Sequence, residues 1–141
     1  MMATVIRAEI SQNNRYWINK HRHYELKHFC LQYPTWKKEY QILGVPSLSS
    51  SVMEKIPTRS SFHSDPTALY AAKKAAYAEK IRLIESIAKE TDKYLYEYIL
   101  KAVTEGLSYN YLRNKLDIPC SKDFYYDRYR RFFWLLSEYR N

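Results

Sequence analysis

The chain has 141 residues, with only two Gly and five Pro, and its formal net charge is +8. This length suits one compact domain or a small domain with a helical extension, and the scarcity of turn residues favours helices over a sandwich or barrel. Two cysteines exclude a disulfide framework, and the lack of an apolar run of about 18 residues excludes a membrane span.

The basic balance favours nucleic acid or another anionic surface as partner, the simpler alternative being a solvated basic surface. The first ten residues lack the apolar core of a signal peptide, so we expect a cytoplasmic protein.

Residues 1–43 are expected to form an N-terminal helical segment. Within 14–34 the sequence is rich in aromatic and basic side chains, and its apolar positions fall on one helical face with the stem of Arg22. These positions are Ile18, Leu26, Phe29, Cys30 and Tyr33. Pro34 should stop or kink this helix, and Thr35 is the expected N-cap of a second helix over 35–43.

Residues 44–64 are rich in Ser and contain two Pro, a composition typical of a linker.

A third segment, 65–141, then begins with a long helix. Ser64 or Asp65 is its expected cap, and Pro66 occupies the first turn, where proline is tolerated. Helical spacing places four residues on one face, which favours a packed core helix over a coiled-coil dimer. They are Tyr77, Ile81, Ile84 and Ala88.

Three further helices are expected after residue 91. Asp92 is the predicted cap of a helix that ends at Gly106, Ser108 caps a short helix with Leu112 and Leu116 facing inward, and Ile118-Pro119 forms a turn. Ser121 caps a last helix that runs to Arg140. This order is that of a tri-helical helix-turn-helix, in which the final helix enters the major groove of DNA. The fold class expected is therefore all-α.

Spacing divides the last helix, 121–140, into two faces. The core face comprises Tyr125, Tyr129, Phe132 and Leu136, widened by Phe133 and Leu135. The remaining arc supplies the expected base contacts, which are Lys122, Asp123, Tyr126, Asp127 and Arg130. The expected phosphate contacts are Arg113, Lys115, Arg128 and Arg131. Trp134 lies off the core face, so it is a candidate contact with a second copy or with RNA polymerase.

Two stretches carry a resemblance to known proteins. DPTALYAAKKAAYAEKIRLIESIA and YILKAVTEGLSYNYLRNKLDIPCSKDFYYDRYRRFFWLL resemble small uncharacterised proteins of prophages and mobile elements in Firmicutes, over most of the chain. A looser similarity over 64–140 links the chain to late-operon transcription activators of Gram-positive phages (the RinA/ArpU type) and to region 4 of sigma-70 factors. The looser match rests on Ile118, Pro119, Ser121, Tyr126 and Arg130. Asp123 and Asp127 depart from the activators, which tend to be neutral or basic there.

The resemblance implies a DNA-binding transcription regulator of a phage or mobile element. Three alternatives remain open: a small terminase subunit, a recombination directionality factor, and an anti-CRISPR-like inhibitor that binds a host protein. Double-stranded DNA is the expected partner, and host RNA polymerase, another host protein or a second copy in a homodimer are further ones. We expect no membrane association.

We expect neither an enzyme nor a cofactor. The four candidate metal ligands do not share one helical face. They are His21, His23, His28 and Cys30. Two glycines cannot build a phosphate loop. The carboxylates of Asp123 and Asp127 have a spacing that a magnesium-dependent nuclease could use, but among arginines such acids more often form local ion pairs.

Overall fold

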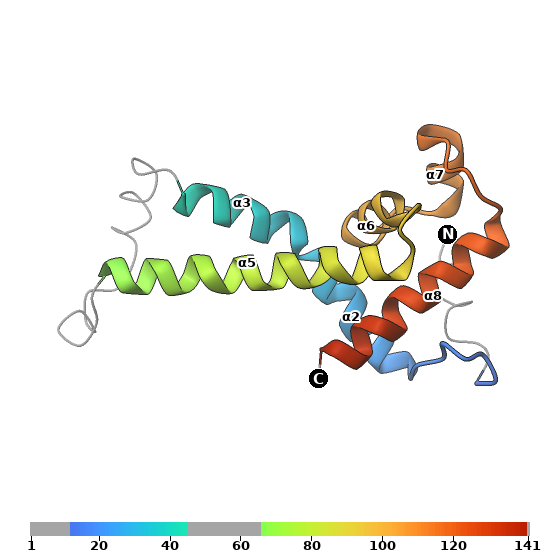
Figure 1. The fold of residues 1–141 in the computed structure, drawn as a ribbon, viewed down its shortest axis with the longest axis horizontal. Coiled ribbons are helices and arrows are strands. Elements are labelled where there is room, and N and C mark those ends of the chain that lie inside the picture. Colours follow the sequence, from blue (N-terminus) through green and yellow to red (C-terminus); the bar gives the residue numbers. More distant parts are fainter. Residues whose placement is uncertain (1–11, 45–65, 141) are drawn as a thin grey trace. The chain divides into compact units, whose positions relative to one another are not determined.

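The computed structural model describes residues 12–44 and 66–140, which form helices joined by short turns (Figure 1). Within these two ranges no strand is present, so the predicted all-α class is confirmed. In chain order the helices are α2 (Lys20–Leu31), α3 (Tyr33–Leu43), α5 (Pro66–Thr91), α6 (Tyr96–Glu105), α7 (Tyr109–Leu116) and α8 (Lys122–Tyr139).

The described residues divide into two compact units. Unit 1 contains residues 12–32 and 84–140, so it holds α2, the last turns of α5, and α6, α7 and α8. Unit 2 contains residues 33–44 and 66–83, so it holds α3 and the first turns of α5.

This grouping differs from the domains predicted from the sequence, which were 1–43, 44–64 and 65–141. The predicted N-terminal segment is split, because α2 packs on α6 and α8 while α3 belongs to unit 2. Nearly all of the predicted linker lies outside the described residues.

Helix α2 is held in unit 1 by apolar burial and by one arginine. Leu26 and Cys30 are fully buried, and Phe29 is nearly so, which confirms most of the expected apolar face. Arg22 donates from Nη2 to the carbonyl oxygens of Ser137 (3.2 Å) and Arg140. These carbonyls belong to the C-terminal end of α8, where helical carbonyls have no partner within the helix.

The junction of α2 and α3 differs from the prediction. Helix α2 ends at Leu31, with Gln32 as its C-cap, and α3 begins at Tyr33. Pro34 therefore sits in the first turn of α3, where its missing N–H costs nothing. The expectation that Thr35 is the N-cap was wrong, because Thr35 already lies inside the helix.

Helix α5 starts at Pro66, as expected for a first-turn proline, whereas the predicted caps Ser64 and Asp65 lie outside the described residues. Its predicted core face is buried at Ile84 and Ala88, and only partly covered at Tyr77 and Ile81.

Asp92 stabilises a turn rather than the first turn of α6. Its Oδ1 accepts hydrogen bonds from the backbone N–H groups of Tyr94 and Leu95, both at 2.9 Å. Helix α6 therefore begins at Tyr96, later than predicted, and ends at Glu105 with Gly106 as its C-cap, as predicted. Gly106 has φ of 71°, a left-handed conformation in which a side chain would be strained, and its N–H bonds to the carbonyl of Ala102.

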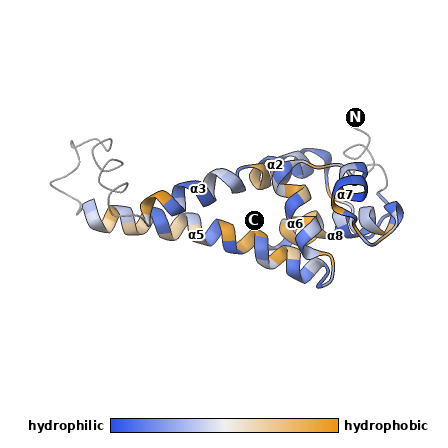
Figure 2. Cartoon of the chain, turned by 90° about the horizontal axis from the view of Figure 1, so that it is seen from above, coloured by the Kyte–Doolittle hydropathy of each residue, from blue (hydrophilic) through white to orange (hydrophobic). Residues whose placement is uncertain are grey.

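The core of unit 1 is built around α8, and all six residues predicted for its core face are buried. Tyr125, Phe132 and Leu136 are fully enclosed. Figure 2 shows α7, whose sequence is YNYLRNKL, coloured mainly as hydrophilic. Helix α7 contributes few apolar side chains to the core, and most of its surface faces solvent.

Candidate nucleic-acid interface

Helices α7 and α8 both begin at a serine cap, as the sequence predicts. Ser108 Oγ accepts a hydrogen bond from the N–H of Tyr111, and Ser121 Oγ accepts one from the N–H of Phe124, each at 3.2 Å. Each cap satisfies one of the N–H groups that have no partner within the helix. The caps fix the first turns of both helices.

The turn between α7 and α8 is closed by backbone hydrogen bonds. Asp117 adopts a left-handed conformation, with φ of 53°, and the N–H of Ile118 reaches back to the carbonyl of Leu112 (3.1 Å). The N–H of Asp117 bonds to the same carbonyl, so two consecutive N–H groups of the turn are satisfied by α7. The side chain of Ile118 is fully buried, so the turn is anchored in the core. The left-handed conformation of Asp117 was not predicted from the sequence, although aspartate tolerates this conformation better than most residues.

Tyr109 fastens α7 to the start of α8. Its hydroxyl donates to the carbonyl oxygen of Cys120 at 2.6 Å, and its ring centre lies 5.7 Å from that of Tyr125 and 6.4 Å from that of Tyr126. Buried aromatic contacts of this kind add to the apolar burial itself. The helix-turn-helix is therefore held at its caps, its turn and this ring cluster.

The expected base contacts do not all lie at the surface. Lys122 and Asp123 are exposed on the first turn of α8, and Asp127 and Arg130 are half-buried one and two turns later. Tyr126 is 6% exposed, which corrects its assignment to the accessible arc. Its ring packs against Tyr125 and Tyr129 as well as Tyr109, because the core covers a wider face of α8 than the predicted stripe.

Phe124 is an exposed aromatic residue on the first turn of α8. Its ring is 46% exposed, and the guanidinium of Arg128 lies 5.4 Å from the ring centre. Helical spacing could have found this residue, because position 124 lies three residues before 127 and outside the predicted core stripe. Phe124 was not among the base or phosphate contacts predicted from the sequence.

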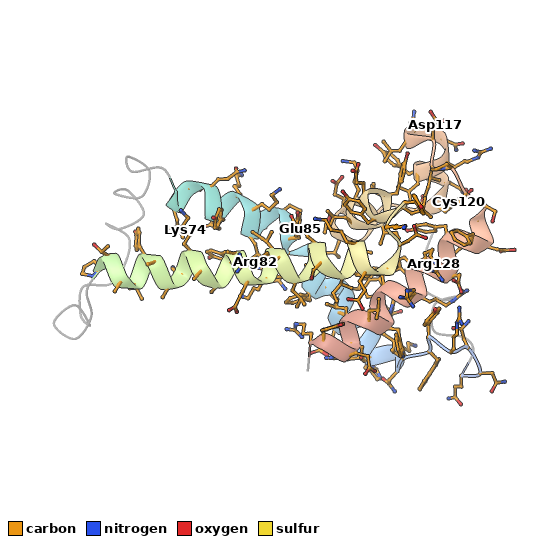
Figure 3. The ribbon with its side chains drawn as sticks, in the orientation of Figure 1. Lys74, Arg82, Glu85, Asp117, Cys120 and Arg128 are labelled. Atoms are coloured by element: carbon orange, nitrogen blue, oxygen red, sulfur yellow. The ribbon has the colours of Figure 1, made fainter. Side chains whose placement is uncertain are left out.

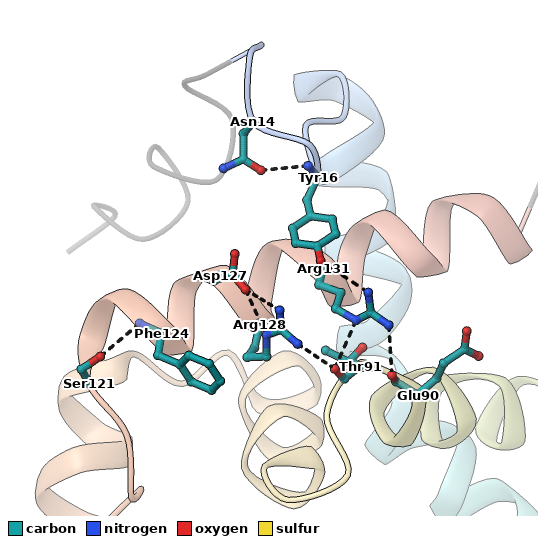
Figure 4. Close-up of polar contacts among 9 residues, drawn as sticks. All are labelled: Asn14, Tyr16, Glu90, Thr91, Ser121, Phe124, Asp127, Arg128 and Arg131. Atoms are coloured by element: carbon teal, nitrogen blue, oxygen red, sulfur yellow. Dashed lines mark hydrogen bonds and ion pairs between the residues drawn. The ribbon is translucent and has the colours of Figure 1, made fainter.

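Two of the four expected phosphate contacts are instead engaged inside unit 1 (Figure 4). Arg131 donates from Nε to the carbonyl of Thr91 (3.2 Å) and from Nη2 to that of Glu90 (3.5 Å). Arg128 donates from Nη1 to the same Thr91 carbonyl (3.3 Å). Both arginines therefore satisfy the last carbonyls of α5 and place positive charge at the negative end of its dipole.

Asp127 completes this cluster, because its Oδ2 accepts hydrogen bonds from Nε and Nη2 of Arg128. Desolvation acts to lower the pKa of Arg128, but the hydrogen bond and charge of Asp127 outweigh it and raise that pKa. One carboxylate oxygen of Asp127 is therefore already occupied by hydrogen bonds from Arg128.

The other two phosphate candidates, Arg113 and Lys115, are exposed in the last turn of α7. Tyr111, also on α7, is 44% exposed. We use the name α7–α8 surface for seven of the exposed residues of α7 and of the first turn of α8. They are Tyr111, Arg113, Asn114, Lys115, Lys122, Asp123 and Phe124.

Trp134 is half-buried, and its ring centre lies 5.7 Å from that of Tyr16, so part of its surface is covered by the segment before α2. In the described part of the chain no group of three or more His, Cys, Asp or Glu side chains could hold a metal ion. Cys30 is a buried free thiol whose pKa is raised by desolvation.

Comparison of the chain with family models, with curated proteins and with solved structures gives no match. Among the described helices, none combines the length and apolar character that crossing a membrane requires.

Proposed function

We propose that the chain binds double-stranded DNA through α7, the turn and α8, and that it acts as a transcription regulator of a phage or mobile element. The proposal rests mainly on one observation, the exposed cations on both sides of the turn. Arg113 and Lys115 lie at the end of α7, and Lys122 lies at the start of α8. In a helix-turn-helix these positions lie where the phosphate backbone and the major groove meet.

The exposed side chains suit distinct roles in this proposal. Arg113 and Lys115 would neutralise phosphates, which adds affinity without sequence preference. In the major groove, Lys122 can donate to guanine and Asp123 can accept from cytosine N4. Phe124 can contact the methyl group of thymine. The proposal assigns no phosphate contact to Arg128 and Arg131, because their guanidinium groups donate to carbonyls at the end of α5.

The test is selection of duplexes from a random-sequence pool by the full chain, followed by binding measurements at several salt concentrations. Replacement Lys122→Ala should relax the preference at one base pair and cost about 1–3 kcal/mol on the selected site. Lys115→Ala should weaken all duplexes similarly and lower the salt slope by about 1. Lys20→Ala is the matched control, because Lys20 is an exposed lysine on α2.

Two results would contradict the proposal at different levels. Unchanged sequence preference in Lys122→Ala and in the double variant with Arg130→Ala would remove α8 as the recognition helix. Absence of duplex binding at low salt would remove DNA binding altogether, since electrostatic attraction is strongest there.

A protein partner is the second candidate, and the exposed rings of the α7–α8 surface favour it. Phe124 and Tyr111 are each nearly half exposed, and Asp123 beside them repels phosphate. Aromatic residues are enriched at protein interfaces. Under this alternative Phe124→Ala abolishes binding of a host protein, while duplex binding is absent in the unaltered chain.

A further inference from the structure

Unit 2 contains an open groove between α3 and the first turns of α5. Its volume is about 290 Å³. Three side chains of each helix line it, at spacings that place them on one helical face. They are Lys37, Tyr40 and Gln41 from α3, and Ala78, Ile81 and Arg82 from α5. Figure 3 labels Arg82 and Lys74 on α5.

The floor of the groove is apolar and its rim is cationic. Ala78 and Ile81 are partly exposed, and the ring of Tyr40 is 37% exposed. The side chains of Lys37 and Arg82 are exposed at the edges. An apolar floor with charged edges is typical of a surface that receives an amphipathic segment.

Three lysines of unit 2, including Lys37 of the groove, lie against aromatic rings of α3. The ammonium of Lys74 lies 5.1 Å from the ring centre of Tyr40, and that of Lys80 lies 5.3 Å from the ring centre of Trp36. Lys37 lies 5.6 Å from the ring centre of Tyr33. Such cation–π contacts restrict the lysine side chains, so less entropy is lost when the lysines meet an anion.

Unit 2 carries a large excess of positive charge. Its described residues contain six lysine and arginine side chains and only two acids, Glu39 and Glu79, neither of which lines the groove. A positive field of this kind attracts acidic partners and raises their association rate.

The apolar floor and the positive charge of the groove favour one kind of occupant over the others. A second copy is disfavoured because the chain itself carries a net charge of +8. The connecting segment 45–65 has as many acids as lysines and arginines, so it does not complement the rim. Duplex DNA offers phosphates but no aliphatic side chain for Ala78 and Ile81. We propose that the groove binds an acidic amphipathic segment of a protein partner, with an apolar side chain between Tyr40 and Ile81 and carboxylates at Lys37 and Arg82.

The experiment selects peptides from a random library, displayed on phage, against the full chain. The enriched peptides should share Asp or Glu residues on either side of an aliphatic or aromatic anchor. A selected peptide, synthesised with a fluorophore, should lose affinity about tenfold or more in the double variant Lys37→Glu and Arg82→Glu, as judged by anisotropy. Lys38→Glu is the matched control, because Lys38 is exposed on α3 outside the groove and its variant should bind normally.

Ile81→Asp provides an independent test, because it places a carboxylate on the apolar floor and should abolish peptide binding. Circular dichroism of each variant serves as the control that the helices are retained. Failure to enrich any acidic peptide, or equal affinity of the selected peptide for the double variant, overturns the proposal. The proposal is also overturned if the double variant loses duplex binding but keeps peptide binding, because the groove would then bind nucleic acid.

Discussion

His23 shows how one residue links packing to pH. Its side chain is 2% exposed, and its ring centre lies 4.9 Å from that of Phe133. Among the residues that the structure describes, none forms a hydrogen bond with Nε2 of His23. Desolvation, with a smaller contribution from Lys27, lowers the pKa of His23 from 6.5 to about 4. The buried imidazole is therefore neutral in the folded protein at neutral pH.

We expect the free energy of unfolding to fall as the pH is lowered from 6.5 towards 4. In this window the unfolded chain binds a proton at His23 and the folded chain does not, so the loss reaches at most about 3 kcal/mol. Urea unfolding between pH 7 and 5 measures it. His23→Leu should flatten the dependence and His21→Ala, at an exposed position, should not. An equal slope in His23→Leu would disprove the assignment.

At the scale of the element, the C-terminal end of α5 depends on arginines from α8. Arg128 and Arg131 both donate to the carbonyl of Thr91, which lies 37 residues before the first and 40 before the second. They join two helices of unit 1 through hydrogen bonds to charged groups, which are stronger than neutral ones. The positive charge of this part of α8 is therefore structural.

Arg131→Ala should lower the free energy of unfolding by about 1–3 kcal/mol, because it removes the charged hydrogen bonds to the Glu90 and Thr91 carbonyls and leaves only Arg128 at the end of α5. Arg131→Lys should recover only part of that loss, since lysine lacks the planar fork of donors. Denaturant unfolding gives both values, with Arg113→Ala as an exposed control expected within about 0.5 kcal/mol of the unaltered chain. Normal stability in Arg131→Ala, accompanied by a smaller salt slope for DNA binding, would return Arg131 to a phosphate-binding role.

At the scale of the whole molecule, α2 is part of the fold that presents the α7–α8 surface. It packs on both α6 and α8, and it buries Leu26 and Cys30 completely. Arg22 also reaches the end of α8 across 115 residues of sequence. Unit 1 is therefore formed by residues from the N-terminal and the C-terminal parts of the chain, which pack against each other.

A fragment of residues 65–141, the predicted C-terminal domain, should consequently lose cooperative unfolding. Leu26→Ala in the full chain should cost about 2–5 kcal/mol, as for other buried leucines. Thermal unfolding, monitored by circular dichroism, compares the fragment and the Leu26→Ala variant with the unaltered full chain. Lys20→Ala serves as the surface control. A fragment that unfolds cooperatively at the same midpoint as the full chain would show that α2 is dispensable.

The sequence by itself determined where the helices lie and which face of α8 is buried. Ser108, Ser121 and Gly106 were predictable because caps and C-terminal turns depend on residues within about four positions of each other. The stripe from Tyr125 to Leu136 was predictable for the same reason, since helical periodicity is local.

Only the tertiary structure decided which charged and aromatic side chains remain at the surface. Arg128 and Arg131 were indistinguishable from Arg113 by local pattern, and their partners on α5 lie too far away in sequence for spacing to indicate them. Tyr126 is buried because rings from α7 and α8 meet over it. Local rules place a residue on its own helix, whereas burial depends on which other elements pack against that helix.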